Sequence, residues 1–408
     1  MRILLVHNSY QYHGGEDVVF QSERDLLNSA GHHVSAYTRS NHEIGNYGWR
    51  QRVSLAPRAV WAWDTLKQLR QRITSERPDI AHFHNTFPLV SPSAYLACRE
   101  AGVPVIQTLH NPRLLCPAAT LYRAGAVCQD CISAKAFLPA IIHGCYRNSR
   151  VQTAAVASML AIHRKLRTWD KLVDRYIASS DFFARKFGDT ILPKAKIVIK
   201  PHFVPRNRCP AAGCGEYALF VGRLALEKGV ATLLRASTLS PHVPLKIRGD
   251  GPLFNEVHRC AALHNLPIEW LPRLAEEELI LLFQKARFLI WPSEGLYETF
   301  GLAAIEAFAC GVPVIASNLG VMAGTVRHGD TGLLFTAGNA EDLAAKVEWA
   351  WAHPAEMKTM GLAARAEYEA KYTPEANYNL LIGIYSAALA GGTAGSRDAK
   401  LDLIGAPV

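Results

Sequence analysis

Residues 288–316 read FLIWPSEGLYETFGLAAIEAFACGVPVIA, and they give the strongest indication of the fold class. Its first four residues form an apolar run with the length of a buried strand, and residues 312–316 form a second such run. A helix-compatible segment lies between the two runs. A strand, a helix and a second strand in this order are typical of a parallel α/β sheet.

The same alternation extends outward through both halves of the chain. The other strand-like runs are residues 2–7, 33–37, 80–84, 103–110, 175–178, 217–222, 245–249 and 268–271. Helical segments, such as 64–76 and 92–101, lie between most of them. The sequence therefore predicts the α/β class with doubly wound parallel sheets.

A proline-rich segment, PHFVPRNRCP at 201–210, separates the two halves and is typical of a linker. We expect one domain over residues 1–205 and a second domain over 206–373. A further helix is predicted over about 374–390, and the glycine-rich start of 391–408 predicts a loose tail.

The composition is that of an ordinary globular protein, since hydrophobic residues make up 49% of the 408 residues and charged residues 19%. These fractions exclude collagen-like, mucin-like and wholly disordered chains. Nine cysteines are too sparse for a disulfide scaffold. No run approaches about 18 apolar residues, and the apolar start is too short for a signal peptide. We therefore expect a cytoplasmic chain, for which peripheral contact with the inner face of the cell membrane is allowed.

The net charge of +9 is unevenly distributed. Residues 1–205 hold 26 Lys and Arg against 14 Asp and Glu, whereas residues 206–408 hold 18 against 21. The first half therefore carries +12 and the second half −3. Such an excess of positive charge favours an anionic binding partner for the first half. Nucleic acid is disfavoured as that partner, because the sequence contains no nucleic-acid recognition motif.

Two cations follow a glycine at the end of the 217–222 strand. Gly222 lets a ligand approach the backbone, and Arg223 and Lys228 lie at the start of the next helix. This arrangement suits a diphosphate. The alternative is an ordinary strand, turn and helix with solvated basic side chains.

Two carboxylates flank the start of the helix in the opening stretch. Glu298 lies at the strand-to-helix junction, beside backbone N–H groups of residues 299–301 that would be exposed there, and Glu306 is about two turns further on. Glu306 has mostly apolar neighbours, so its carboxylate needs a partner such as ligand hydroxyls. The alternative is that Glu298 is a first-turn carboxylate favoured by the helix dipole and that Glu306 is a solvated helix residue. Glu294 lies four residues before Glu298. The sequence therefore leaves open which of these two carboxylates belongs to the ligand site.

These motifs occur in a specific order: Gly222-Arg223…Lys228-Gly229, then GDGP at 249–252, then Pro-Ser…Glu298-x7-Glu306. They are followed by GVPVIA at 311–316 and GDTGLL at 329–334. In order and spacing the chain, up to about residue 385, resembles the retaining family-4 glycosyltransferases. The resemblance implies the GT-B architecture, in which two Rossmann-like domains face a cleft. It also implies that the final helix crosses back to the first domain.

The resemblance implies roles for single residues. Arg223 and Lys228 would neutralise the diphosphate of a nucleotide-sugar donor, Glu306 would bind the ribose, and Glu298 would hold the transferred sugar. His110, which ends a strand, matches the family's active-site histidine. The implied catalytic residues are His110, Glu298, Arg223 and Lys228. The implied donor-binding residues are Gly14, Gly15, Gly222, Arg223, Lys228, Thr299, Phe300, Gly301, Leu302 and Glu306.

The expected function is retaining transfer of a sugar from a nucleotide-sugar to a saccharide or lipid-linked acceptor, in bacterial cell-surface polysaccharide synthesis. No cofactor is expected to be required for catalysis, because preplaced cations stabilise the departing diphosphate. A nicotinamide dehydrogenase is disfavoured, since no G-x-G-x-x-G follows the first strand. A catalytically silent, sugar-nucleotide-binding partner of another transferase is the alternative.

Four cysteines are clustered in the first half: Cys116, Cys128, Cys131 and Cys145. The central C-x2-C and two flanking cysteines predict a structural zinc site with four thiolates. The alternatives are four ordinary thiols or a disulfide pair, and the latter is disfavoured in a reducing compartment.

Residues 147–171 combine basic and apolar side chains. The basic residues are Arg147, Arg150, Arg164, Lys165, Arg167 and Lys171. Such a segment favours docking to an anionic membrane or a lipid-diphosphate acceptor. The alternative is the solvated face of a core helix.

Overall fold

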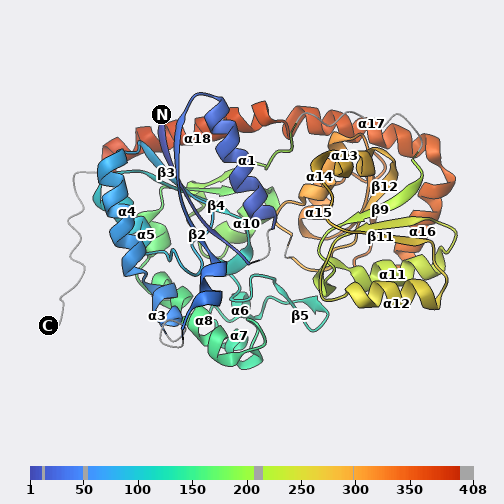
Figure 1. Ribbon diagram of the computed structural model, residues 1–408, viewed down its shortest axis with the longest axis horizontal. Helices are drawn as coiled ribbons and strands as arrows, with labels where there is room; N and C mark the ends of the chain where they lie inside the picture. The colour runs from blue at the N-terminus through green and yellow to red at the C-terminus, as the bar shows by residue number, and fades with distance from the viewer. Residues whose placement is uncertain (12–13, 49–53, 206–214, 297, 396–408) are drawn as a thin grey trace.

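The computed structural model describes residues 1–11, 14–48, 54–205, 215–296 and 298–395, and Figure 1 shows two α/β domains side by side. The first domain contains a six-stranded sheet with the order β2-β1-β3-β4-β7-β8, all pairs parallel. Its strands are β1 (Arg2–Ser9), β2 (His33–Ser40), β3 (Ile80–Phe83), β4 (Val105–Leu109), β7 (Arg175–Ala178) and β8 (Ile197–Ile199).

Helices cover both faces of this sheet because alternate strand residues point to opposite sides. Leu4 and Val6 of β1 join one core cluster, whereas Ile3 and Leu5 join another. The longer helices of the domain are α1 (Gly15–Ser29), α4 (Trp63–Glu76), α5 (Ala94–Glu100), α8 (Arg150–Lys165) and α10 (Asp181–Gly188). The short helical segments are η1 (Asn41–Asn46), α3 (Leu55–Val60), η2 (Pro112–Leu114), α6 (Asp130–Ser133), α7 (Leu138–His143), α9 (Thr168–Leu172) and η3 (Lys194–Lys196).

The second domain repeats the design with the strand order β11-β10-β9-β12-β13-β14, again all parallel. Its strands are β9 (Tyr217–Val221), β10 (Leu245–Arg248), β11 (Ile268–Leu271), β12 (Ala286–Trp291), β13 (Val314–Ser317) and β14 (Gly332–Phe335). Its helices are η4 (Leu226–Lys228), α11 (Val230–Leu239), α12 (Phe254–Leu263), α13 (Glu276–Gln284), α14 (Leu302–Ala309), α15 (Gly320–Thr325), α16 (Ala340–Ala352) and α17 (Pro354–Lys371).

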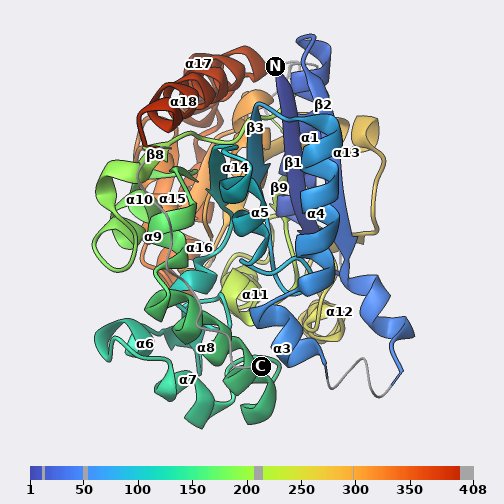
Figure 2. The ribbon, with the colours of Figure 1, turned by 90° about the vertical axis from the view of Figure 1, so that its left-hand side faces the viewer.

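The last helix, α18 (Pro374–Gly395), returns to the first domain and packs on its sheet (Figure 2). Leu381 and Tyr385 are fully buried there, and the Tyr385 hydroxyl lies 2.8 Å from Nδ1 of His82 in β3. The helix continues five residues beyond its expected end, so residues 391–395, expected in the loose tail, are helical. Residues 396–408 lie outside the described part of the chain.

The chain crosses between the domains twice, and the two crossings lie together. The backbone N–H of Val204 donates to Tyr372 O at 3.3 Å, and the Tyr368 hydroxyl donates to Val204 O at 3.0 Å. The expected domain boundary at 205/206 borders residues 206–214, which are not described. None of the described helices has the length and apolar character needed to cross a bilayer.

Each sheet has one point at which the strand order reverses, between β1 and β3 in the first domain and between β9 and β12 in the second. Open α/β sheets bind ligands beyond the carboxyl ends of the strands at such points. The segments that follow these four strands contain Gly14-Gly15, His84, Gly222-Arg223 and the loop carrying Glu298. The topology therefore places a candidate site between the two domains.

Candidate active site

Glycines bring the loops of the second domain into contact. Gly229 has φ +69°, and a Cβ on it would lie 1.9 Å from Pro292 O, so only glycine fits between η4 and the loop after β12. A Cβ on Gly249 would lie 1.9 Å from Gly222 O. These close approaches place Lys228 beside the Glu298 loop.

Lys228 and Glu298 form an ion pair at the carboxyl edge of the second sheet. Their side chains are 16% and 12% exposed, and the Ser293 hydroxyl donates to the same carboxylate oxygen at 3.1 Å. Burial alone would raise the pKa of Glu298, but the charge and hydrogen bond of Lys228, with that of Ser293, hold the pKa below its ordinary value. Glu298 is therefore an anion in a nearly dry setting.

Glu294, the neighbouring carboxylate, has different partners. Thr232 of α11 donates to one of its oxygens at 2.5 Å, and the hydroxyl of Tyr122, from the first domain, donates to the other at 3.3 Å. Burial, followed by the charge of Glu294, raises the pKa of Tyr122 to about 12, so its phenol stays protonated. Glu298 is thus the carboxylate that lies against Lys228. Glu294 instead connects the loop to Thr232 and Tyr122.

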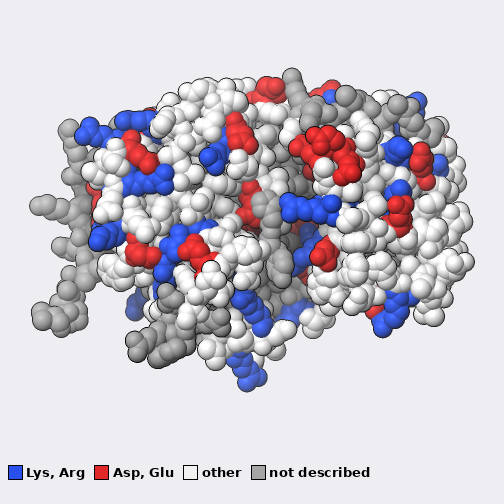
Figure 3. Space-filling view, viewed as in Figure 1, with Lys and Arg blue, Asp and Glu red and all other residues white. Residues whose placement is uncertain are grey.

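Arg223 lies on the rim of the same edge. Its side chain is about half exposed and forms an ion pair with Glu227. Figure 3 shows basic and acidic side chains along the hollow between the two halves of the molecule. The two predicted cations therefore differ in setting, because Lys228 is largely enclosed and Arg223 faces solvent.

Helix α14 begins where the backbone turns at Gly301. This residue has φ +88°, and a Cβ on it would lie 2.1 Å from the ring of Trp291. Leu302, Ala303 and Glu306 form the partly exposed face of α14, whereas Ala304, Ile305, Ala307 and Phe308 are buried. A Cβ on Gly15 would lie 3.4 Å from the Leu302 side chain, so this face of α14 looks across to the glycine turn of the first domain.

On the first domain, His110 belongs to a stack of buried histidines. Its Nε2 lies 2.9 Å from His84 Nδ1, and its ring stacks on His84 and His202 with centroids 5.1 and 5.3 Å away. Burial, followed by the neighbouring histidines, lowers the pKa values of His84 and His110 well below the ordinary value. Both rings are therefore neutral near pH 7.

The two sides are joined directly at this point. The Thr299 hydroxyl donates to His110 O at 2.9 Å, and the Ser179 hydroxyl donates to Thr299 O at 2.8 Å. The ring of Phe300 meets His202 edge-on at 5.0 Å. Thr299 and Phe300 thus connect the loop that carries Glu298 to the strand end that carries His110.

The glycine turn is fixed by an aspartate that the sequence analysis did not single out. Asp17 accepts a hydrogen bond from the Gly14 N–H at 2.8 Å and lies 2.8 Å from His7 Nε2. Beside it, Asn111 donates to Glu16 at 2.6 Å, and burial raises the pKa of Glu16. The only sequence signal for these residues was their position after strand β1 or β4.

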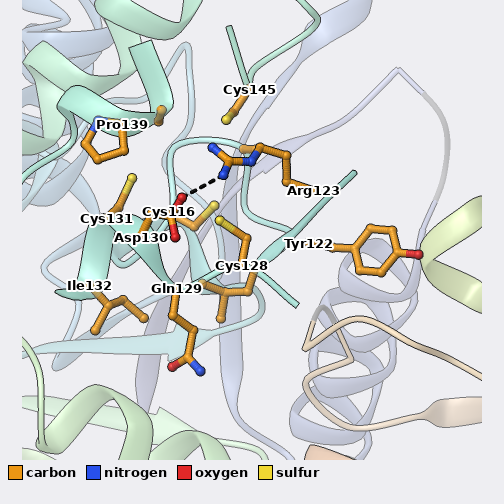
Figure 4. Close-up of a pocket in the computed structure, with 13 residues that line it drawn as sticks. Cys116, Tyr122, Arg123, Cys128, Gln129, Asp130, Cys131, Ile132, Pro139 and Cys145 are labelled. Atoms are coloured by element: carbon orange, nitrogen blue, oxygen red, sulfur yellow. Dashed lines mark hydrogen bonds and ion pairs between the residues drawn. The ribbon is translucent and has the colours of Figure 1, made fainter. Parts of the chain in front are cut away.

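The four clustered cysteines line one pocket in the first domain (Figure 4), and neither Lys228 nor Glu298 is among the residues that line it. No three of their Sγ atoms lie within 4.8 Å of one another. A tighter set of candidate ligand atoms belongs to Glu23, His82 and His84. Lys200 Nζ already lies 2.6 Å from Glu23 Oε1, so that carboxylate has a cation in place.

Two doubly wound domains face each other, with a cation–carboxylate pair at one switch point and histidines at the other, and this is the arrangement in which open α/β sheets bind ligands. Residues 13–208 match the model of "Glycosyltransferase Family 4" and residues 210–367 that of "Glycosyl transferases group 1". The chain belongs to this family of glycosyltransferases.

Named relatives agree with this assignment. The chain is 32% identical over 160 residues to the D-rhamnosyltransferase WbpZ of Pseudomonas aeruginosa, covering 39% of this chain and 42% of that protein. It is 28% identical over 329 residues to a glycogen synthase of Mycobacterium tuberculosis, covering 78% and 70%. The match to WbpZ thus spans less than half of that relative's length.

The fold likeness extends over nearly the whole chain. The structure of Anabaena HepE in complex with UDP-glucose superposes with a TM-score of 0.64 at 17% identity, covering 97% of this chain and 100% of that one. The predicted GT-B fold of two parallel-sheet domains is confirmed.

Proposed function

We propose that the chain is a retaining glycosyltransferase that moves a sugar from a nucleoside diphosphate to a hydroxyl of a saccharide or lipid-linked acceptor. The observation that carries this proposal is the enclosed Lys228–Glu298 pair at the switch point of the second sheet, joined through Thr299 to His110 of the first. A site with a largely enclosed cation, a largely enclosed anion and a neutral imidazole suits a reaction in which charge separates.

The donor would lie on the second domain. Its diphosphate would contact Arg223 and Lys228 near Gly222, and the partly exposed face of α14, with Glu306, would meet the nucleoside. HepE in complex with UDP-glucose makes a UDP-sugar the first donor to test. Glu298, anionic and oriented by Ser293, would hold the hydroxyls of the transferred sugar.

The chemistry follows from where charge develops. The bond between the anomeric carbon and the diphosphate oxygen breaks, and its electron pair leaves with the diphosphate, where the two cations stabilise it. The acceptor hydroxyl attacks the same face of the sugar, and its proton passes to the departing phosphate oxygen. His110, neutral because of burial, would contact the sugar without adding a repulsive positive charge. The two cations supply this stabilisation, so we propose no metal cofactor for this step.

The acceptor would bind the first domain. A pocket beyond β3 and β4 is lined by polar side chains that suit sugar hydroxyls, among them Asn85, Thr86, His110, Asn111 and Arg113. The +12 charge of residues 1–205 fits an acceptor that carries phosphate or is attached to an anionic membrane. We therefore place the chain at the inner face of the cell membrane, in the synthesis of a bacterial cell-surface polysaccharide.

A panel of UDP-sugars, with and without acceptor sugars, tests the proposal. We expect donor hydrolysis or transfer by the wild type and at least a hundredfold loss in Glu298→Ala. The control is Glu341→Ala, an exposed glutamate at the start of α16, which should keep full activity. A product of inverted anomeric configuration would contradict the retaining mechanism. Donor binding without any turnover would instead favour a silent sugar-nucleotide-binding partner.

A further inference from the structure

Four cysteines reach one pocket of the first domain from separate segments (Figure 4). Cys116 follows η2, Cys128 follows the second strand of the hairpin formed by β5 (Tyr122–Arg123) and β6 (Ala126–Val127), Cys131 lies in α6, and Cys145 follows α7. All four are partly buried, and none is in a disulfide. A pocket lined by four thiols from four segments is a donor set with the composition of a structural zinc site.

The segment that carries these cysteines contains little regular secondary structure. Between Cys116 and Cys145 the chain forms two strands of two residues each, a four-residue helix and a six-residue helix. Few of its apolar side chains are fully buried, and Leu121, Phe137 and Ala140 are the main ones. A bound metal ion is one way to fix a segment in which regular secondary structure is so sparse.

A divalent ion that coordinates four thiols displaces their protons and neutralises the resulting thiolates, which would otherwise repel one another. Arg123 lines the same pocket and pairs with Asp130 at 2.7 Å.

We propose that Cys116, Cys128, Cys131 and Cys145 bind one structural zinc ion. Zinc–sulfur bonds of about 2.3 Å in a tetrahedral site would bring the sulfurs closer together than they now lie, within about 4 Å of one another. Four protein ligands leave no open position for water, so this ion has a structural role.

The zinc site would fix the part of the first domain that reaches the donor loop. Cys128 N donates to Leu121 O at 2.9 Å, which anchors the base of the β5–β6 hairpin beside the sulfurs. Tyr122, in that hairpin, points away from the cysteines and donates to Glu294 (Figure 4). A Cβ on Gly295 would lie 3.3 Å from the Tyr122 side chain. Zinc would therefore order a contact between the domains four residues from Glu298.

Metal analysis of the purified full-length protein tests the proposal and does not depend on the transferase activity. We expect about one zinc per chain in the wild type and less than a tenth of that in Cys128→Ser and Cys131→Ser. Cys260→Ser is the matched control, because this partly buried cysteine lies in α12 of the second domain, and it should retain the metal. Zinc-free protein after expression in zinc-supplemented medium would overturn the proposal, as would a disulfide between any two of the four cysteines.

A second measurement covers the case in which the serine variants do not fold. Cobalt(II) added to wild-type protein stripped of metal should bind with a stoichiometry of one. It should also give the strong visible bands of a tetrahedral site and near-ultraviolet bands from thiolate ligands. Weak octahedral bands, or no binding, would overturn the proposal.

Discussion

At the scale of single residues, Lys228 is the main electrostatic partner of Glu298. Both side chains are less than one-fifth exposed, so each charge depends on the other for the stabilisation that water no longer provides. Sequence spacing placed both residues at strand ends but did not show that they meet. Their contact depends on Gly229 fitting against Pro292, a packing detail that a single sequence does not reveal.

We predict that breaking this pair costs both stability and activity, but that the two losses separate in a double variant. Lys228→Met or Glu298→Gln alone should lower the free energy of unfolding, by about 3 kcal/mol for Lys228→Met, because Glu298 is left charged without its partner. Lys228→Met combined with Glu298→Gln should regain most of that loss yet remain inactive. Urea unfolding and kcat/KM measured on all four proteins would check this, and a fully active double variant would contradict it.

The stacked histidines predict a loss of stability in mild acid. Burial, with the charge of Lys200, lowers the pKa of His202 to about 3, and burial lowers that of His82 to about 4. In the unfolded chain these groups titrate near 6.5, so the unfolded state binds more protons between pH 6.5 and 4. The free energy of unfolding should therefore be fully present above pH 6.5 and should fall below it, by about 1.4 kcal/mol per pH unit for each histidine.

Urea unfolding at pH 7.5, 6.5 and 5.5 measures this dependence. His202→Phe removes one titrating ring. The decrease in the free energy of unfolding between pH 6.5 and 5.5 should therefore be smaller by about the contribution of one histidine. An unfolding free energy that stays constant over this interval would show that the buried rings are not neutral in the folded protein.

At the scale of elements, the start of α14 determines what the second sheet presents to a ligand. The helix can begin at Leu302 only because Gly301 takes a left-handed conformation against Trp291. The segment before Gly301 contacts the first domain through Thr299. The first turn of the helix directs Leu302 toward Gly15. One glycine thus positions both the Glu298 loop and the exposed face of the helix.

We predict that Gly301→Ala destabilises the protein and weakens donor binding, because its methyl group would overlap the Trp291 ring. The loss in unfolding free energy should exceed about 2 kcal/mol. Gly324→Ala in α15 is the control, since its added methyl group meets nothing within 4 Å. Thermal unfolding with and without UDP measures both effects, and equal behaviour of the two variants would contradict the prediction.

Elements with a strong local pattern were predictable from the sequence. The strands at 2–7 and 268–271 and the helix at 64–76 lie where apolar runs or periodicity indicated them. Strand β8 was missed because it is only three residues long, and β14 was noted only as part of the GDTGLL motif. The hairpin β5–β6 was missed because each of its strands has only two residues. Partners across domains, such as Tyr122 and Glu294, depend on packing that no local pattern encodes.

At the scale of the whole molecule, two of the basic residues of the positively charged first half adjoin exposed apolar side chains of helices α7 and α8. We define the α7–α8 patch by Leu138, Ile142, Val151, Arg147 and Arg150, of which Val151 is 81% exposed. Arg150 donates to Ile142 O at 3.0 Å, so the basic and apolar parts adjoin. The interleaved residues Val156, Met159 and Leu160 face the core, as expected for a core helix, and membrane docking of the exposed side stays a prediction.

We predict that the α7–α8 patch binds anionic membranes. Val151→Glu should at least halve co-sedimentation with phosphatidylglycerol vesicles, because it removes apolar contact and adds a repelling charge. Leu263→Glu is the control, since Leu263 is 75% exposed but lies on the second domain. Equal recovery of the wild type with neutral and anionic vesicles would contradict the prediction.

The paired crossings of the chain at Val204 and Tyr372 also determine how the two domains can separate. Two adjacent, hydrogen-bonded connections act as a hinge. They restrict the relative motion of the two domains largely to rotation about one axis. In Figure 1 helices α17 and α18 run along one side of the molecule, and β5 lies at the opposite side. Atoms far from a hinge travel furthest, so we expect the distance between Tyr122 and Glu294 to change more than distances near the hinge when the domains rotate apart. The distance between two spectroscopic labels placed across this contact would therefore be a sensitive measure of the angle between the domains.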